Sequence, residues 1–303
     1  MLSNFLEAEM RRRSLIGGVL AVLLLSLSMA AMSPKLRERG FSAIMRDNER
    51  MEPFAIAPHL YYVGTSNISA FAIETSDGLI LIDGGYEATA PVVLTNLHTL
   101  KFDPKTVRVL LNTHAHFDHA GGLAALKEAT GAKLYASPYD ADLLESGGRG
   151  DFFLGDWMTF PPVKVDHRLN DGEELKVGTT TLTAHFTPGH TKGCTSWSFP
   201  VEIDGRQLQA LEICSLSTLV YRLVNNAQYP GIAADFSNTF SVLRNLRCDL
   251  FLVPHGTAFD LRKKRERQKA QPTANPFVDP EGCRALIDGS EADFRSKLKA
   301  QGG

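Results

Sequence analysis

This chain of 303 residues has neither a large excess of charge of one sign nor closely spaced cysteines. Lysine and arginine number 32 and aspartate and glutamate 34, so the net charge is −2. The basic run at 262–267 is short, and we interpret it as the solvated face of a helix. A protein dedicated to nucleic acids needs a strongly positive surface, which this composition does not supply. No C-x-x-C pair occurs, which argues against a cysteine zinc finger and a thioredoxin-like motif.

The remaining composition is that of a globular protein. Hydrophobic residues make up 44% of the chain, charged residues 22% and aromatic residues 9%. These fractions exclude a collagen-like fibre, a low-complexity chain and a disordered tail. A chain of this length can bury a large core.

The first thirty residues have the pattern of a secretory signal peptide. Three consecutive arginines, 11–13, precede an uncharged apolar stretch at 15–31 that ends in small residues. The run RRRSLIG also resembles a twin-arginine signal, and an uncleaved membrane anchor is the alternative to cleavage. We expect residues 1–30 to be removed and residues 31–303 to form one exported domain, periplasmic or secreted.

Export makes the four cysteines informative, because an oxidising compartment favours disulfides. Four cysteines allow three pairings, and some of them could instead be buried free thiols. The four residues are Cys194, Cys214, Cys248 and Cys283.

Predicted strands and helices alternate along the chain, which indicates an α/β protein with layered sheets. Short runs rich in β-branched residues predict strands, and apolar residues at helical spacing predict helices. We see no repeat and no linker that would split the domain. Strands are expected at 60–63, 70–74, 79–82, 107–111, 133–136, 163–169, 174–177, 180–186, 195–199, 207–213 and 250–253, and helices at 91–100, 123–129, 231–246, 259–270 and 281–299.

A dense group of metal-binding residue types follows the strand expected at 107–111. The next residues read NTHAHFDH and contain His114, His116, Asp118 and His119. Alternation along an extended chain brings the first two histidines to the same side, and the other two residues follow in a turn. Imidazoles with one carboxylate are ligands that Zn²⁺ binds well.

Two further histidines occupy the same kind of position at other strand ends. His190 follows the strand expected at 180–186, and His255 follows the strand expected at 250–253. Functional residues collect at strand ends in layered α/β folds, so we expect both to complete the metal site. The four other histidines lack this setting and are interpreted as surface or structural residues.

These motifs resemble those of the metallo-β-lactamase superfamily. HAHFDH is accompanied by LILIDGG upstream and by TPGH and VPHG downstream. The segments HFTPGHTKGCTSW and NPFVDPEGC are similar to the third subclass of the class B (zinc) β-lactamases. The resemblance covers most of residues 50–300.

The resemblance implies a four-layer αβ/βα sandwich with two zinc ions per chain in a groove at one edge. Three protein ligands per zinc would leave positions open for water. The implied ligands are His114, His116 and His190 for the first zinc, and Asp118, His119 and His255 for the second.

Supporting residues are implied as well. Asp83, in LILIDGG, matches a buried carboxylate that braces the ligand loops, with a simple turn-capping role as the alternative. The implied disulfides join Cys194 to Cys214 and Cys248 to Cys283.

The activity implied is that of a secreted β-lactamase acting on penicillins, cephalosporins and carbapenems. Hydroxide on zinc would attack the lactam carbonyl, and Asp118 would orient this nucleophile. Ser215 and Ser217 would donate hydrogen bonds to the substrate carboxylate. A monomer is expected, with a small-molecule substrate, no nucleic-acid partner and no stable membrane association after signal cleavage.

Two other functions are compatible with this fold or site. Thioesterases and lactonases of the superfamily place a bridging aspartate where this chain reads CSLS, at 214–217, without a carboxylate. A non-catalytic secreted zinc-binding protein is the second alternative, and the open water positions argue against it.

Three features depart from the subclass or lack an assigned role. Gly256 stands where proline is common, which would give the backbone after His255 more freedom and hold the second zinc less rigidly. Lys192 replaces another common proline. The segment 147–157 starts with glycines and continues with aromatic residues, so it could flank the groove or pack on the body of the protein.

Overall fold

The computed structural model describes residues 48–271 and 274–303. The chain clusters into two compact units, and the larger comprises residues 49–218 and 222–303, which carry the strands and helices given below. The signal peptide expected at 1–30 lies outside the described residues. Within the described part of the chain, no helix has the length and apolarity needed to cross a membrane.

The first sheet contains seven strands in sequential order, β1-β2-β3-β4-β5-β6-β7. Neighbours are antiparallel from β1 to β4 and parallel from β4 to β7. The parallel half places the carboxyl ends of β4, β5 and β6 at one edge, where functional loops collect. The strands are β1 (Phe54–Ala57), β2 (Leu60–Tyr62), β3 (Phe71–Thr75), β4 (Gly78–Ile82), β5 (Val107–Leu111), β6 (Lys133–Ala136) and β7 (His167–Arg168).

The second sheet contains five strands in the order β12-β11-β10-β9-β8. Neighbours are antiparallel from β8 to β11, and β12 runs parallel to β11. An Asp204-Gly205 pair with positive φ at both residues closes the hairpin between β10 and β11, as two-residue hairpin turns require. The strands are β8 (Glu174–Val177), β9 (Thr180–Phe186), β10 (Thr195–Ile203), β11 (Arg206–Glu212) and β12 (Leu250–Leu252).

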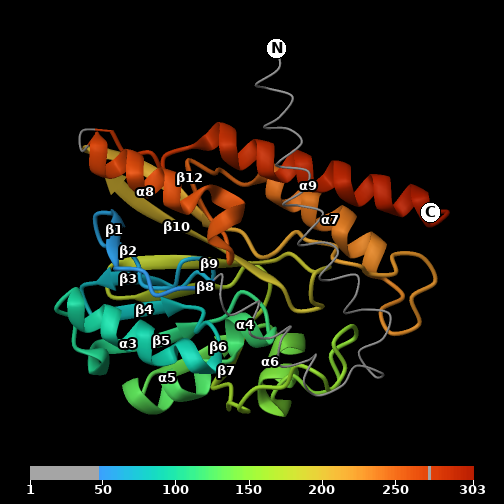
Figure 1. Cartoon of the computed structure of the whole chain (residues 1–303), viewed down its shortest axis with the longest axis horizontal. Helices are drawn as coiled ribbons and strands as arrows, with labels where there is room; N and C mark the ends of the chain where they lie inside the picture. The colour runs from blue at the N-terminus through green and yellow to red at the C-terminus, as the bar shows by residue number, and fades with distance from the viewer. Residues whose placement is uncertain (1–47, 272–273) are drawn as a thin grey trace. The chain divides into compact units, whose positions relative to one another are not determined.

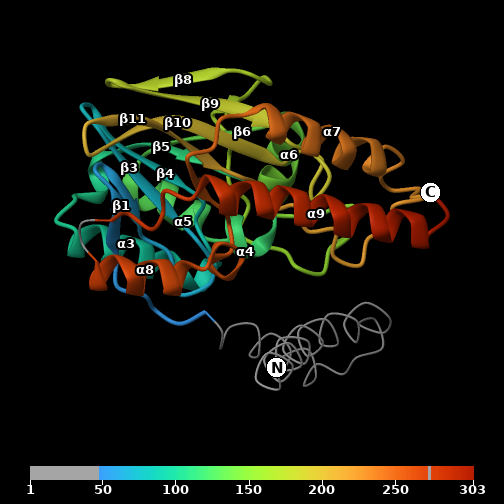
Figure 2. The same ribbon diagram turned by 90° about the horizontal axis from the view of Figure 1, so that it is seen from above.

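Helices cover the outer sides of both sheets. Figure 1 shows α3 and α5 on the side of the first sheet and α7, α8 and α9 on the side of the second, and Figure 2 gives the view from above. The four-layer αβ/βα sandwich expected from the sequence is therefore confirmed. The helices are α3 (Ala90–Thr99), α4 (Phe117–Ala120), α5 (Leu123–Thr130), α6 (Pro138–Ser146), α7 (Ile232–Asn245), α8 (Leu261–Ala270) and α9 (Pro280–Ala300).

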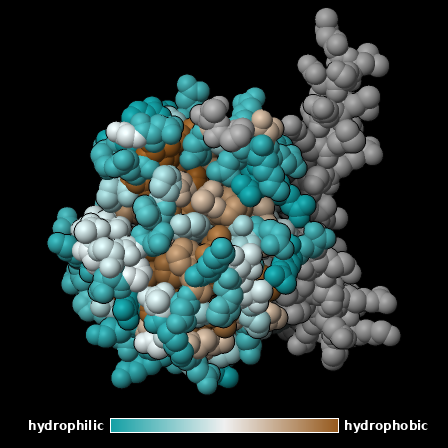
Figure 3. Space-filling view, turned by 90° about the vertical axis from the view of Figure 1, so that its left-hand side faces the viewer, coloured by the Kyte–Doolittle hydropathy of each residue, from teal (hydrophilic) through white to brown (hydrophobic). Residues whose placement is uncertain are grey.

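Apolar side chains on both faces of the first sheet hold the layers together. Leu81 of β4 belongs to a buried cluster that includes Val93 of α3 and Leu126 of α5. Because side chains alternate along a strand, the fully buried Ile80 points to the opposite face, toward the second sheet. On the face shown in Figure 3, apolar residues occupy the centre and hydrophilic residues surround them.

Aromatic rings join α7 to α9 and support a loop of the site. The rings of Phe236 and Phe240 on α7 lie 5.4 and 5.7 Å from that of Phe294 on α9. The Phe236 ring also packs against Gly189, where a Cβ would come within 2.8 Å of it. The φ of +139° at Gly189 suits glycine alone, so the loop before His190 is fitted to this ring.

Two disulfides connect segments that the sheets bring together. Cys194 pairs with Cys214, between the start of β10 and the end of β11, and Cys248 pairs with Cys283, between the approach to β12 and α9. This is the pairing that the resemblance implied. No free cysteine remains in the described residues.

Several elements differ from the sequence predictions. The strand expected at 163–169 is reduced to the two residues of β7, and neither β1 nor α6 was predicted. The basic run on α8 is not wholly solvated, because Lys264 is 2% exposed. Its Nζ lies 2.8 Å from Oδ2 of Asp279 and above the Phe251 ring, so an ion pair between the buried lysine and a partly exposed aspartate ties α8 to the start of α9.

Replacing Phe236 by alanine should destabilise the protein by about 3–5 kcal/mol, because the ring is fully buried between α9 and the 188–190 loop. Chemical denaturation followed by circular dichroism measures this change. Ser237→Ala is the control, since that hydroxyl is exposed and bonds only its own helix. A loss below about 1 kcal/mol for Phe236→Ala would contradict the packing described here.

Candidate metal centre

Three histidines from two strand ends form the first cluster. His114 and His116 follow β5, and His190 follows β9. Their ring centroids are 4.7 to 4.9 Å apart, and one nitrogen from each lies within 4.8 Å of the others. All three are buried, although the sequence places His190 more than seventy residues away from the other two.

Asp118, His119 and His255 form the second cluster. The first two lie on α4, a single turn of helix at the place where the sequence predicted a turn, and His255 follows β12. Oδ2 of Asp118 is 3.2 Å from Nε2 of His119 and 3.6 Å from Nε2 of His255. The two Nε2 atoms are 3.2 Å apart, so three potential ligand atoms converge.

The two clusters are adjacent, since the ring centroids of His114 and His119 are 4.3 Å apart. Burial, and then the neighbouring histidines, hold the pKa of His114 and His190 well below its usual value. Neutral imidazole is the form that binds metals. Nε2 of His114 is buried without a hydrogen-bond partner, which is costly unless a ligand such as a metal satisfies it. The donor set therefore fits two borderline-soft cations such as zinc.

Asp118 is suited to remain ionised in this setting. Burial raises its pKa, but the nearby His119 and His255 together lower it by more, so the pKa falls below its usual range. An ionised carboxylate is a metal ligand and a strong hydrogen-bond acceptor.

Asp83 braces the segment that carries the first histidines. Its Oδ1 accepts hydrogen bonds from the Thr113 N–H at 2.7 Å and from Nδ2 of Asn112 at 3.0 Å, and its Oδ2 accepts one from Oγ1 of Thr113 at 2.6 Å. Oδ2 also faces Nδ1 of His119 at 3.8 Å. Burial raises the pKa of Asp83 to about 6 despite these partners. The side chain therefore does more than cap its own turn.

Asp140 is a second bracing carboxylate, which the sequence reasoning missed. From the first turn of α6, its Oδ2 accepts bonds from the Ala115 N–H at 2.9 Å and from Oγ1 of Thr191 at 3.1 Å. These partners lie next to the histidines of the first cluster on two different loops. Burial raises the pKa of Asp140 to about 7. The position of Asp140 just beyond the end of β6 is the sequence feature that could have indicated its role.

Asp151 is another carboxylate beside the histidines, and the second that the sequence reasoning missed. Its Oδ2 lies 3.7 Å from Nε2 of His116, with both side chains at most 5% exposed. Burial raises the pKa of Asp151, but the contact with His116 and two backbone N–H groups lower it by more, so the pKa falls.

The residues predicted to bind substrate lie beside the first cluster. The carbonyl oxygen of Ser217 accepts a bond from Nδ1 of His190 at 2.7 Å, and the Ser217 N–H lies 3.4 Å from Oγ of Ser215. Ser217 is exposed and Ser215 half-buried. The disulfide lies against the same loops, since Sγ of Cys214 is 3.2 Å from the carbonyl oxygen of Thr113.

Gly256 is held closely, contrary to the greater backbone freedom expected from its sequence. Its N–H donates to the carbonyl oxygen of Asn67 at 2.6 Å, a bond that proline could not make. A Cβ there would come 2.8 Å from a side-chain carbon of Leu261. Glycine at this position therefore lets the backbone pack closely against the Leu261 side chain.

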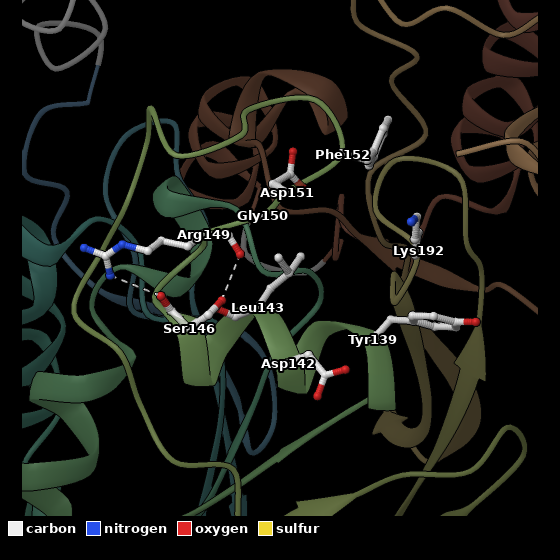
Figure 4. A pocket seen from close by; sticks show the side chains of 9 residues that line it. All are labelled: Tyr139, Asp142, Leu143, Ser146, Arg149, Gly150, Asp151, Phe152 and Lys192. Carbon is white, nitrogen blue, oxygen red and sulfur yellow. Dashed lines mark hydrogen bonds between the residues drawn. The ribbon is translucent and has the colours of Figure 1, made fainter. Parts of the chain in front are cut away.

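A pocket of about 340 Å³ adjoins the first cluster through Asp151 and Lys192. Figure 4 shows Phe152 and Lys192 on one side of it and the side chains of α6 below. Nζ of Lys192 lies 5.3 Å from the Tyr229 ring centroid, and that ring meets Phe152 edge-on. Its lining residues are Tyr139, Asp142, Leu143, Ser146, Arg149, Gly150, Asp151, Phe152 and Lys192.

Three of the histidines interpreted as surface or structural residues bond elsewhere. His59 contacts Glu74 at 2.9 Å, and His167 contacts Glu173 at 2.6 Å. His185 lies 2.8 Å from Oγ of Ser198.

Solved structures similar to this one carry β-lactamase names. The metallo-β-lactamase of Cronobacter sakazakii, described by a HARLDQ motif, is 39% identical with a TM-score of 0.82, over 86% of this chain and 98% of that one. Native FEZ-1 metallo-β-lactamase from Legionella gormanii is 40% identical with a TM-score of 0.82, over 84% and 98%. BJP-1, a subclass B3 metallo-β-lactamase of Bradyrhizobium japonicum, is 37% identical with a TM-score of 0.80, over 86% and 98%.

Curated relatives match a smaller part of the chain. A hydroxyacylglutathione hydrolase of Hyphomonas neptunium is 33% identical over 95 residues, which are 31% of this chain and 30% of that protein. A type 2 metallo-β-lactamase of a Bacillus species is 32% identical over 125 residues, or 41% and 43%. The chain thus spans less than half the length of either relative.

Most of the clustered histidines lie in the part of the chain that one family model matches. The model of the metallo-β-lactamase superfamily matches residues 63–202, which include both the HAHFDH segment and His190. With the structural neighbours at 37 to 40% identity over nearly their whole length, this shows that the chain belongs to the metallo-β-lactamase superfamily and resembles its subclass B3.

Proposed function

We propose that the protein is a secreted di-zinc β-lactamase that hydrolyses the lactam amide of penicillins, cephalosporins and carbapenems. The observation that carries this proposal is the pair of adjacent three-residue clusters, one of three histidines and one of Asp118, His119 and His255. These clusters occur in a chain similar over most of its length to structures named metallo-β-lactamases.

Each cluster would hold one zinc ion. His114, His116 and His190 would bind the first, and Asp118, His119 and His255 the second. Bound zinc supplies a Lewis acid for a carbonyl oxygen and lowers the pKa of water, which makes a nucleophile available near neutral pH. No protein nucleophile is then required.

The chain's own residues would orient the reactants around these ions. Asp118 remains ionised and would accept a hydrogen bond from the attacking water, which fixes its direction. Ser215 and Ser217, on the loop after β11, would donate hydrogen bonds to the carboxylate that β-lactams carry. The Ser217 carbonyl holds Nδ1 of His190, so this loop is anchored to the metal cluster.

A thioesterase or lactonase is the second candidate, favoured by the match to a hydroxyacylglutathione hydrolase. The segment 214–217, which follows β11 into the site, contains no carboxylate that could bridge two metals. The match to that hydrolase also covers only 31% of this chain. The β-lactamase is therefore the better-supported function.

Export is part of the proposal. The arginine-rich start followed by an apolar stretch supports a signal peptide at 1–30, and two disulfides in the described residues suit an oxidising compartment such as the periplasm. We propose that residues 31–303 act as a single-domain monomer.

The purified protein should open the ring of a carbapenem in the presence of zinc, and chelation should abolish this activity. Ultraviolet absorbance of the lactam measures the rate, with a thioester and a lactone assayed in parallel under the same conditions. Zinc-dependent cleavage of the thioester or lactone without lactam turnover would instead support the second candidate.

Replacing His116 by alanine should weaken zinc binding at the first cluster by more than about a hundredfold, because it removes one of three ligands. Hydrolysis should fall toward background. Competition with a chromophoric chelator measures the affinity. His185→Ala is the matched control, since His185 is half-buried, bonds Ser198 and belongs to neither cluster. Equal zinc affinity in both variants would refute the ligand assignment.

A further inference from the structure

We propose that Asp151 is a positioning residue for His116 and that it couples the 147–157 segment to the first metal. The proposal rests on the proposed function in one respect, namely that His116 is a metal ligand. Nothing in the family motifs led to Asp151, which lies 35 residues beyond His116 on a different loop.

Asp151 and His116 face each other with one polar atom each. Oδ2 of Asp151 and Nε2 of His116 are 3.7 Å apart, and neither atom has a hydrogen-bond partner among the described residues. Both side chains are buried, at 3% and 5% exposure. A buried imidazole N–H and a buried carboxylate oxygen left apart would each carry a desolvation cost, which their contact relieves.

The other two histidines of the cluster also face an oxygen with one ring nitrogen, at shorter distances. Nδ1 of His114 lies 3.0 Å from Oγ1 of Thr113, and Nδ1 of His190 lies 2.7 Å from the carbonyl oxygen of Ser217. Each of these rings therefore engages an oxygen with Nδ1, which would direct Nε2 toward a metal. In His116 the nitrogen that faces the oxygen is Nε2, which would leave Nδ1 for the ion.

Metal-binding histidines are oriented by an acceptor on their second nitrogen, which fixes the tautomer and strengthens the ligand. Of the three acceptors, Thr113 Oγ1 and the Ser217 carbonyl are neutral, and Asp151 alone supplies a carboxylate. At 3.7 Å it faces His116 as a charge rather than as a hydrogen-bond acceptor, and a shortening of this distance would turn the contact into a charge-assisted hydrogen bond.

The other oxygen of Asp151 organises its own loop. Oδ1 accepts hydrogen bonds from the Phe153 N–H at 2.8 Å and the Leu154 N–H at 2.6 Å. The neighbouring Phe152 ring packs edge-on against Tyr229, with centroids 5.0 Å apart. One carboxylate thus contacts a metal ligand with one oxygen and holds with the other a loop that lines the pocket.

Because one carboxylate makes both contacts, metal binding and the order of the loop affect each other. A metal on Nδ1 of His116 directs Nε2–H toward Asp151 and so favours the loop conformation that presents this oxygen. By linkage, the ordered loop raises metal affinity by the same factor. The proposal predicts two separate observables, one at the metal and one at the loop.

The test compares Asp151→Asn with Asp156→Asn in the full-length protein. An asparagine at 151 keeps an oxygen for the Phe153 and Leu154 N–H groups, but its amide nitrogen cannot accept from His116. Asp156 lies in the same loop, where its Oδ1 accepts from the Gly150 N–H at 3.0 Å, and it is exposed. Both variants remove one negative charge from the same segment.

Zinc affinity is measured by competition with a chromophoric chelator, fitted to two sites. We expect Asp151→Asn to weaken the three-histidine site by roughly 10- to 100-fold and leave the other site unchanged. Asp156→Asn should change either site by no more than about twofold, the range of surface substitutions. Equal affinities in wild type and Asp151→Asn would overturn the proposal.

Hydrogen exchange gives the second readout, which does not depend on activity. Adding zinc to the wild type should slow exchange of the Phe153 and Leu154 amides, and the slowing should be smaller in Asp151→Asn. Exchange at these amides that does not respond to zinc would refute the coupling. A wild type that binds no zinc would refute the ligand assignment itself, and with it the proposed function.

Discussion

The site depends on one buried carboxylate held in a conformation that side chains rarely adopt. Asp83 has a φ of +63°, which costs about 1 kcal/mol outside glycine. Its N–H donates to the Leu111 carbonyl at the end of β5, and the Gly84 N–H donates to the His119 carbonyl on α4. Its carboxylate then fixes Thr113, directly before His114, the first of the clustered histidines. Both ends of the HAHFDH segment are thus set by one turn after β4.

Carboxylates recur around the histidines for an electrostatic reason. Asp83, Asp140 and Asp151 each contact a clustered histidine or a residue next to one, from three different parts of the chain, and Asp118 is itself in a cluster. Buried anions without nearby cations are costly in free energy, and a divalent cation bound between them would lower that cost. Burial raises the pKa of Asp83 to about 6 and that of Asp140 to about 7, so a negative charge on either side chain is costly.

The sequence predicted most strands, the fold class and the six clustered residues, because strand patterning and strand-end histidines are local signals. His190 and His255 were found from the strands that precede them. Asp140, Asp151 and the buried Lys264 escaped because their roles arise from contacts with distant loops. The helix α6 also escaped prediction, since its polar sequence buries only a few residues. The strand β7 is short because only His167 and Arg168 pair with β6. Gly256 was misjudged because close packing is invisible in a one-dimensional pattern.

The distance in sequence between the clustered side chains has a consequence for the life of the protein in its compartment. His119 and His255 are 136 positions apart yet touch, so the site exists only once the chain has folded throughout. An ion that binds the native form alone stabilises it by mass action, by about 2.7 kcal/mol when free metal exceeds the dissociation constant a hundredfold. Metal scarcity would then shorten the survival of the molecule against proteases, so that supply governs abundance as well as turnover.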